Sequence, residues 1–379
     1  MQRIGQSWLV LKLTDSGTAL GIVVALQYLP VLIISPLGGV LADRFIKRKV
    51  LYLTQSVSLA LALILGFLVV TNHAELWMVY VLAAMLGIAD SIDAPTRHSF
   101  IHEMVGGELL KNAVTLNSVM ANLAKIIGPA LAGLVIAGMG IAPCFFLNAA
   151  SYLGVLVCLY LMRGHELNTV EPVKEIKGQV VRGLHYVANT PPIRNVLIIV
   201  AIVGMFSYEF QVSLPLMAKF AFHSDARGYA FLMSSMGVGA ILGGLATAGR
   251  KRLGPSRLVW PLMAFGLALF LTAISPNLIF AGFMMVLVGF FSITFTALAN
   301  TTIQLESDPN MRGRVMALWT VAFLGTTPIG GPIVGWVGEH IAARGSLIVG
   351  MLAALLAGIY GILVFKQKPA CERSSVPTR

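Results

Sequence analysis

The stretch Gly38-Gly39-Val40-Leu41-Ala42-Asp43-Arg44-Phe45-Ile46-Lys47-Arg48-Lys49 decides how the rest of the chain is interpreted. It joins one long apolar segment to the next through a single carboxylate and four basic residues. Basic residues in short loops are retained on the cytoplasmic side of a membrane. The stretch therefore predicts a cytoplasmic loop between two membrane-spanning helices.

The composition of the whole chain agrees with a membrane protein. Apolar and aromatic residues make up 57% of the 379 residues, and charged residues make up 11%, against about 25% in soluble domains. A soluble domain this apolar could not cover its own surface with polar groups. The composition excludes a soluble enzyme, a disordered chain and a disulfide-linked secreted scaffold. We predict an all-α membrane protein, because a lone strand would leave backbone groups unpaired in lipid.

Eleven apolar segments are long enough to cross a bilayer, which takes about 20 residues in a helix. They are 18–42, 50–70, 76–93, 112–138, 141–162, 193–218, 229–248, 258–275, 278–302, 315–338 and 346–365. The shorter segment 1–13 precedes them. We expect it to be an incomplete first helix, with Met1 an internal methionine of a longer chain.

The distribution of Lys and Arg predicts the orientation. Alternate loops hold 21 of the 27 Lys and Arg residues, against 4 in the opposite set of loops. This bias places the first set in the cytoplasm, and an even number of helices places both termini there too. We expect a multi-pass protein of the bacterial cytoplasmic (plasma) membrane, in which the net charge of +11 reflects topology rather than nucleic-acid binding.

Two motif pairs indicate that the chain consists of related halves. Gly38-Gly39-Val40-Leu41-Ala42 has a counterpart in Gly243-Gly244-Leu245-Ala246, and Gly128-Pro129 with Gly133 has one in Gly331-Pro332 with Gly335. The nearly equal offsets predict a duplicated six-helix unit, as in transporters built from parallel repeats. The predicted parts are bundles at 1–165 and 193–368, a cytoplasmic linker at 166–192 and a cytoplasmic tail at 369–379. In the linker, the spacing of four apolar residues predicts a short amphipathic helix on the membrane surface: Ile176, Val180, Leu184 and Val187.

The motifs also resemble those of a known family. The stretch from Gly39 to Lys49 resembles the signature loop of the major facilitator superfamily, and Gly128-Pro129-Ala130-Leu131-Ala132-Gly133 resembles the fifth-helix motif of its exporters. Ala94-Pro95-Thr96-Arg97 and Met311-Arg312-Gly313-Arg314-Val315-Met316 are similar to runs in the branch that contains the enterobactin exporter and the transmembrane secretion effectors. The resemblance implies a major facilitator fold of about twelve helices, and a transporter rather than an enzyme.

The resemblance further implies a gate on the cytoplasmic side. In it, Asp43 docks on the start of the helix near Val315 and pairs with Arg97. The rest of the gating motif is Gly39, Arg44, Lys47 and Arg48. Proline removes a backbone hydrogen bond from a helix, so we expect bends at Gly128-Pro129 with Gly133 and at Gly331-Pro332.

Ionisable side chains inside a span are costly unless they are paired or hydrated, so each is a functional candidate. They are Arg3, Asp90, Asp93, Lys125 and Glu209. Glu209 is suited to carrying a proton, or alternatively to a structural hydrogen bond with a neighbouring helix. Lys125 either neutralises a carboxylate, faces an anionic substrate or forms a fixed ion pair. Asp90 and Asp93 are three residues apart and share a helix face near the cytoplasmic end, where a solvated helix end is the simpler interpretation.

Polar side chains among aromatic residues suggest a substrate pocket. Gln211 and Asn117, together with aromatic residues such as Tyr208, would line a broad and mainly apolar cavity between the halves. Ordinary packing is the more common fate of such aromatic side chains.

These observations predict a secondary active transporter that exports small amphipathic molecules, drug-like or siderophore-like, by alternating access and proton antiport. The chain has no phosphate-binding loop, so we expect no cofactor and an ion gradient as the energy source. We expect a monomer in the bilayer with a small-molecule substrate, no metal site and no nucleic-acid partner. An uptake facilitator of the same fold and a non-transporting membrane remnant are the alternatives.

Overall fold

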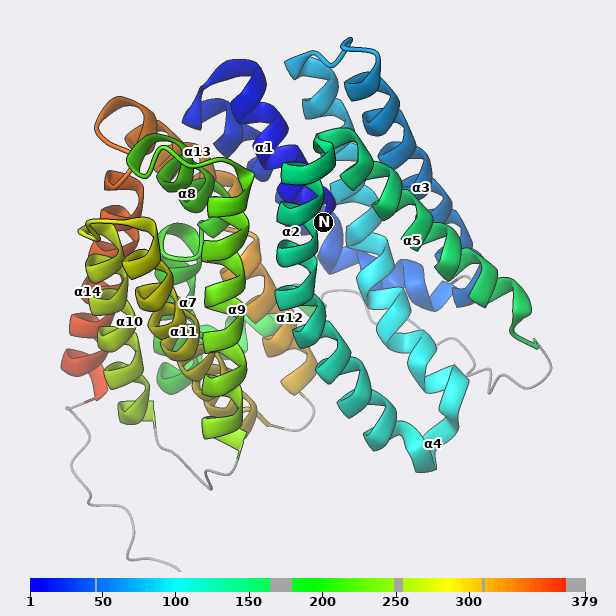
Figure 1. The fold of residues 1–379 in the computed structure, drawn as a ribbon. Coiled ribbons are helices and arrows are strands. Elements are labelled where there is room, and N and C mark those ends of the chain that lie inside the picture. The colour runs from blue at the N-terminus through cyan, green and yellow to red at the C-terminus, as the bar shows by residue number, and fades with distance from the viewer. Residues whose placement is uncertain (45, 164–178, 249–254, 309–310, 366–379) are drawn as a thin grey trace, which may run out of the picture.

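The computed structural model describes residues 1–44, 46–163, 179–248, 255–308 and 311–365, which form helices and short connections and contain no strand. In Figure 1, α3, α4 and α5 occupy one side of the molecule. The helices of the first half are α1 (Gln2–Thr14), α2 (Gly17–Arg44), α3 (Lys47–Val70), α4 (Leu76–Met139) and α5 (Ile141–Leu161).

The second half is also helical, and α10, α11 and α14 occupy the other side of the molecule in Figure 1. Its elements are α6 (Gln179–Asn189), α7 (Pro191–Phe206), α8 (Phe210–Leu216), the π-helix η2 (Met217–Ala221), α9 (Ala226–Ala248), the 3-10 helix η3 (Pro255–Leu258), α10 (Val259–Ala273), α11 (Leu278–Glu306), α12 (Arg312–Leu324), α13 (Thr327–His340) and α14 (Gly345–Phe365).

Within the described residues, nine helical segments are long and apolar enough to cross a membrane. The shorter apolar helices are Ile127–Met139 and Val259–Ala273. Across all the helices, apolar side chains are of two kinds. Phe145 and Phe265 are fully buried, whereas Leu134 and Leu245 are about 70% exposed. Lipid tails are as apolar as leucine, so the exposed leucines form a surface suited to lipid.

Helix α4 contains two of the predicted spans, 76–93 and 112–138. No loop separates the two spans, and α4 is helical through all of its 64 residues. A straight helix of this length would extend about 96 Å, roughly three times the hydrocarbon thickness of a bilayer. Figure 1 shows instead that α4 turns back on itself, so its two arms take the places of the two predicted spans.

Two other predicted spans, 193–218 and 315–338, are each interrupted. The first is divided at Ser207–Glu209 into α7 and α8, and the second at Gly325–Thr326 into α12 and α13. The sequence predicted the two spans but neither of these breaks. At the second break Pro328 lies in the first turn of α13, where it lacks a backbone donor and disfavours helical geometry in the residue before it. The two broken helices pack together, since a Cβ on Gly330 would lie only 1.6 Å from the Met205 carbonyl oxygen.

The linker contains the short helix α6, which includes three of the four predicted apolar positions: Val180, Leu184 and Val187. Residues 164–178, including Ile176, lie outside the described part of the chain. Val187 is buried and Leu184 is about half exposed. Gly183 faces Arg314, so α6 packs against the start of α12. Its contact with the membrane surface stays a prediction, as do the bundle and tail boundaries.

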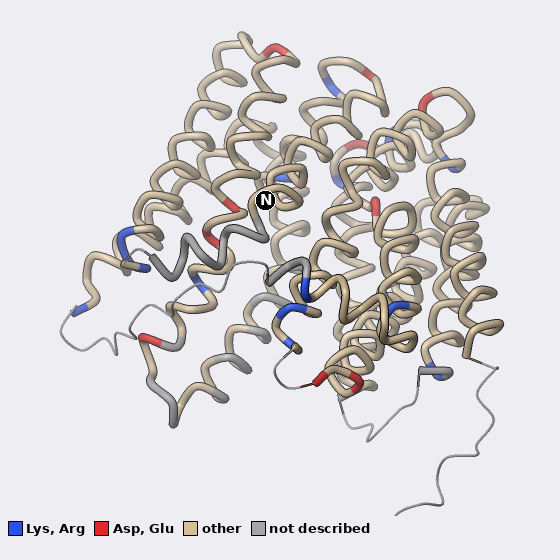
Figure 2. The backbone as a smooth tube through the Cα atoms, turned by 180° about the vertical axis from the view of Figure 1, so that it is seen from behind, with Lys and Arg blue, Asp and Glu red and all other residues tan. Residues whose placement is uncertain are grey.

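The helix ends define two faces of the molecule. The basic face comprises the helix ends near residues 44, 46–49, 182–194, 257–258 and 311–315, and the turn of α4 near residues 97–112. The opposite face comprises the connections at residues 14–17, 71–75, 139–141, 222–226, 274–277 and 340–345. Figure 2 shows that most Lys and Arg residues of the described chain lie toward one end of the helices.

Candidate functional site

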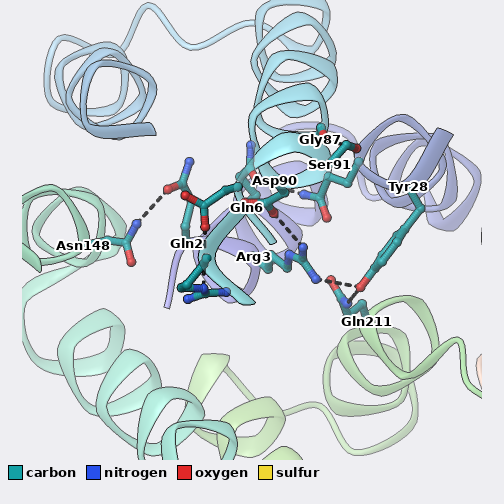
Figure 3. A network of polar contacts seen from close by, with 12 residues as sticks. Gln2, Arg3, Gln6, Tyr28, Gly87, Asp90, Ser91, Asn148 and Gln211 are labelled. Carbon is teal, nitrogen blue, oxygen red and sulfur yellow. Dashed lines mark hydrogen bonds and ion pairs between the residues drawn. The ribbon is translucent and has the colours of Figure 1, made fainter. Parts of the chain in front are cut away.

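A polar network lies between the helices at the centre of the molecule (Figure 3). Arg3, on α1, donates hydrogen bonds to Tyr28 Oη on α2 over 2.6 Å and to Asp90 Oδ2 on α4 over 2.8 Å. Its guanidinium also lies 5.0 Å from the centroid of the Tyr28 ring. The Arg3 and Asp90 side chains remain 39% and 38% exposed. The ion pair is therefore open to solvent although three helices contribute to it.

The network crosses from the first half of the chain to the second. Gln211 on α8 donates a hydrogen bond from Nε2 to Tyr28 Oη over 3.0 Å. The Tyr28 hydroxyl thus accepts from a residue of each half, and Figure 3 shows Arg3 and Gln211 on two sides of it. Gln211 was predicted to line a pocket between the halves, and the structure places it at their junction.

A set of amide side chains surrounds the ion pair. Gln27 donates to Gln6 over 2.9 Å, and Asn148 donates to Gln2 over 2.7 Å. Four amide atoms in this region are buried without a hydrogen-bond partner in the structure: Gln2 Nε2, Gln6 Nε2, Gln27 Oε1 and Gln211 Oε1. Buried polar groups are nearly always hydrogen-bonded, so these four atoms have unused hydrogen-bonding capacity.

Glu209 occupies the break between α7 and α8. Its side chain is 3% exposed, and its Oε1 atom has no hydrogen-bond partner. The Thr327 hydroxyl lies beside the carboxylate, and a Cβ on Gly331 would be 3.6 Å from Glu209 Oε2. Gly331 itself packs on α2, since a Cβ on Gly21 would lie 2.4 Å from its carbonyl oxygen. The carboxyl group is thus next to the contact between α13 and α2.

The aromatic residues near Glu209 pack among themselves. The Tyr208 ring lies 4.8 Å from that of Phe323 and 5.4 Å from that of Phe265, measured between centroids. The Tyr208 hydroxyl donates to the Ser292 carbonyl oxygen. Tyr208 therefore takes part in ordinary packing, which was the alternative to its lining a pocket. The polar groups of the central network come from other residues.

Asp90 and Asp93 have different surroundings, contrary to the expectation of a shared solvated helix end. Asp90 pairs with Arg3 in the central network. Asp93 is buried and accepts hydrogen bonds from Thr54 and Gln55 on α3, each over 2.8 Å. Residues three apart on a helix differ by about 60° in direction, which is enough here to reach two neighbouring helices.

The basic part of the gating motif connects helices of the first half. Lys47 pairs with Glu103 over 2.6 Å. Arg48 donates to the carbonyl oxygens of Leu159 and Tyr160 at the end of α5. Arg97 lies 3.7 Å from Asp93, which is four residues before it.

Several predicted site residues lie outside the part of the structure described at side-chain level. These are Gly39, Asp43, Arg44 and Lys125, so the proposed pairing of Asp43 with Arg97 stays a prediction. Asn117 is partly exposed on the second arm of α4.

The proline-glycine motifs lie where the two halves touch. Pro129 and Pro332 are inside α4 and α13, which continue through them. A Cβ on Gly133 would overlap Ala230 on α9, and Gly331 packs on Gly21. The motifs therefore permit close approach of α4 to α9 and of α13 to α2. A Cβ on Gly128 would lie 4.0 Å from the Met1 backbone nitrogen, which is an ordinary contact distance.

The opposite face carries polar links that the sequence did not point to. Glu339, at the end of α13, accepts hydrogen bonds from Ser16 Oγ over 2.8 Å and from the Thr18 backbone N–H and hydroxyl over 2.8 and 2.6 Å. Lys219 pairs with Asp15 and also donates to the Leu11 carbonyl oxygen. In the sequence, these links were indicated only by Asp15 and Ser16, which are polar residues between two apolar segments. All these contacts join the first half to the second.

A family model describing transmembrane secretion effectors matches residues 1–378. The match includes both halves, the linker and the central network. The chain belongs to this family of major facilitator transporters.

The chain is similar to transport proteins of three bacteria. An MFS-type transporter of Bacillus subtilis is 27% identical over 83% of this chain and 78% of its own length. The enterobactin exporter EntS of Salmonella typhi is 26% identical over 88% and 81%, respectively. The multidrug efflux pump Tap of Mycolicibacterium fortuitum is 22% identical over 94% and 90%.

Solved structures confirm the fold class. A point mutant of the nucleoside transporter NupG superposes with a TM-score of 0.76 at 13% identity, covering 96% of this chain and 94% of that one. The major facilitator fold predicted from the sequence is therefore confirmed. The chain is a multi-pass membrane transporter and not an enzyme, as predicted.

Proposed function

We propose that this chain is a secondary active exporter of small amphipathic molecules, driven by proton antiport, with Glu209 carrying the proton. The observation that carries the proposal is the position of this carboxyl group. It is buried, one of its oxygens has no partner, and it lies against Gly331 where α13 packs on Gly21 of α2. Efflux and export are also the described functions of two relatives, which supports an exporter.

The location of Glu209 provides a means of coupling. A charged carboxylate without a cationic partner is unfavourable in a dry contact, whereas a protonated carboxyl is tolerated. Protonation of Glu209 therefore favours the packing of α13 on α2, and loss of the proton weakens it. Because that packing closes the opposite face, the proton and the closure of this face would be linked, as alternating access requires.

The distribution of basic residues supports the direction of transport. The basic face would lie in the cytoplasm under the positive-inside rule. All the hydrogen bonds and ion pairs between the halves named above lie at the centre or on the opposite face. The structure then corresponds to a conformation closed toward the outside, in which substrate enters from the cytoplasm and a proton leaves Glu209.

The test is transport by purified protein in liposomes of known orientation, with a rhodamine dye as substrate and a pH-sensitive dye in the lumen. Export by antiport predicts dye accumulation that depends on an imposed pH gradient, accompanied by counterflow of protons. Glu209→Gln should abolish gradient-driven accumulation while dye binding persists. The matched control is Glu75→Gln, which changes a carboxylate on the opposite face whose contact is with Trp77 two residues away.

Each alternative function predicts a different result. An uptake facilitator would move dye toward the cytoplasmic side with or without the gradient. A non-transporting remnant would move neither dye nor protons. Gradient-driven export by the Glu209→Gln variant at the wild-type rate would refute the role of this residue.

A further inference from the structure

One face of α1 presents hydrogen-bond donors to the centre of the molecule. Gln6 is four residues from Gln2 and three from Arg3, so its side chain is a neighbour of both on the helix surface. Figure 3 shows them between Asn148 on one side and Tyr28 with Gln211 on the other. This face combines one cation with two amide groups.

Arg3 retains unused capacity for binding. A guanidinium has five N–H donors, and the contacts to Tyr28 and Asp90 use one from each terminal nitrogen. The side chain is 39% exposed, so a solute can reach the remaining donors. The planar guanidinium also matches two oxygens of one anionic group.

The amide groups beside Arg3 also have N–H donors without a hydrogen-bond partner. The Nε2 groups of Gln2 and Gln6 are buried donors without acceptors, in side chains that are 4% and 0% exposed. Gln27 Oε1 and Gln211 Oε1 are acceptors without donors, on α2 and α8. An anionic oxygen group of a solute would accept from the donors on α1. Hydroxyl or amide groups elsewhere on the solute would donate to the acceptors on α2 and α8.

We infer that the exported molecule carries a carboxylate or a comparable oxyanion, which binds Arg3 in competition with Asp90. This inference rests on the proposed transport function and assigns the substrate class of its central site. The chemistry is that of a charge-assisted, forked contact, stronger than a hydrogen bond between neutral groups. It changes the expectation of a mainly apolar pocket into that of a polar one with a defined anchor.

A cationic substrate fits these residues less well. Asp90 is the exposed acidic group of the network, and its Oδ2 atom is already held by Arg3. A cation approaching Asp90 would also meet the positive charge of Arg3 at 2.8 Å from that oxygen. The unpartnered groups next to the ion pair on α1 are donors, which repel rather than coordinate a cation.

The test compares dyes that differ only in whether a carboxyl group is free. The probes are rhodamine B and its ethyl ester, and fluorescein and its methyl ester, with binding to the full chain in lipid nanodiscs followed by fluorescence anisotropy. We expect the acid of each pair to bind about tenfold more tightly than its ester, equivalent to about 1.4 kcal/mol.

Variants at the ion pair should shift this preference in opposite directions. Arg3→Gln removes the anchor and should abolish the preference for the acid, whereas Arg3→Lys, which keeps the charge, should retain part of it. Asp90→Asn removes the competing carboxylate and should raise the affinity for the acid about threefold or more while leaving the ester unchanged. Arg227→Gln, an exposed arginine on the opposite face that pairs locally with Asp225, is the control and should change nothing.

The outcomes separate this inference from the proposed function. Equal binding of acid and ester, tighter binding of the ester, binding of neither dye, or an unchanged preference in Arg3→Gln would overturn the inference. Each of these could occur in a working proton-driven exporter of other solutes. Conversely, a preference for acids that depends on Arg3, without gradient-driven transport in liposomes, would support the inference and refute the proposed function.

Discussion

The polar link at Glu339 leads to a quantitative prediction about closure of the opposite face. The Glu339 carboxylate accepts three hydrogen bonds from Ser16 and Thr18, at the first turn of α2. It thus acts as an N-terminal cap provided by α13 from the other half of the chain. Glu339→Ala removes this cap from the closed conformation only, because the two halves must separate when the face opens.

The magnitude follows from the type and exposure of the contact. Loss of a helix cap costs about 0.5–2 kcal/mol, and contacts of exposed charged groups fall at the lower end because water screens them. Glu339 is exposed, so we expect the closed conformation to lose about 1 kcal/mol. That corresponds to a shift of about fivefold in the ratio of open to closed molecules.

Distances between spin labels measure this ratio directly. Labels at His73 and Pro276 would report on the two halves, since both residues are exposed in connections of the opposite face. On a background without native cysteines, Glu339→Ala should increase the ratio of the longer-distance to the shorter-distance population about fivefold without added substrate. Glu339→Gln keeps an acceptor oxygen and should cause a smaller increase.

The matched control is Glu75→Gln. Glu75 lies on the same face and accepts a hydrogen bond from Trp77 two residues away, within one half of the chain. It should leave the distance distribution unchanged. A distribution in Glu339→Ala that matches the wild type, or an equal shift in the Glu75 variant, would refute the capping argument.

Two further predictions concern packing and the cytoplasmic gate. Gly239→Ala should lower the thermal stability in detergent by about 1–3 kcal/mol, the usual effect of overpacking, because its Cβ would lie 1.8 Å from the Val286 carbonyl oxygen; Gly244→Ala, with no atom within 4 Å, should leave it unchanged. Asp43→Asn should insert normally but reduce transport by about tenfold or more, a typical size for a coupling free energy. Normal efflux by that variant would contradict the gate, and equal melting of the two alanine variants would contradict the packing argument.

Much of the fold follows from local properties of the sequence. Each long apolar segment becomes a helix because lipid provides no partner for backbone groups, and this rule needs no knowledge of neighbouring residues. The breaks at Ser207–Glu209 and Gly325–Thr326 were not predicted. They lie within apolar runs, and the packing of Gly330 against Met205 brings the two broken helices together.

The candidate site could be predicted only in part. Glu209 and Asp90 were identified because a charge inside an apolar segment is evident without a structure. The partners of these residues were not, since Arg3 reaches Asp90 across 87 positions of the chain and Gln211 reaches Tyr28 across 183. Local sequence patterns carry no information about contacts at such separations.

The sequence by itself determined that this protein is a helical membrane transporter, and it predicted duplicated halves, because hydrophobic length, loop charge and repeated motifs are properties of short segments. Only the tertiary structure decided which polar groups meet. It separates Asp90 from Asp93, joins Arg3, Tyr28 and Gln211, and places Glu339 on the start of α2. The physical reason is that a hydrogen bond acts over about 3 Å, so its formation depends on how helices distant in sequence pack together.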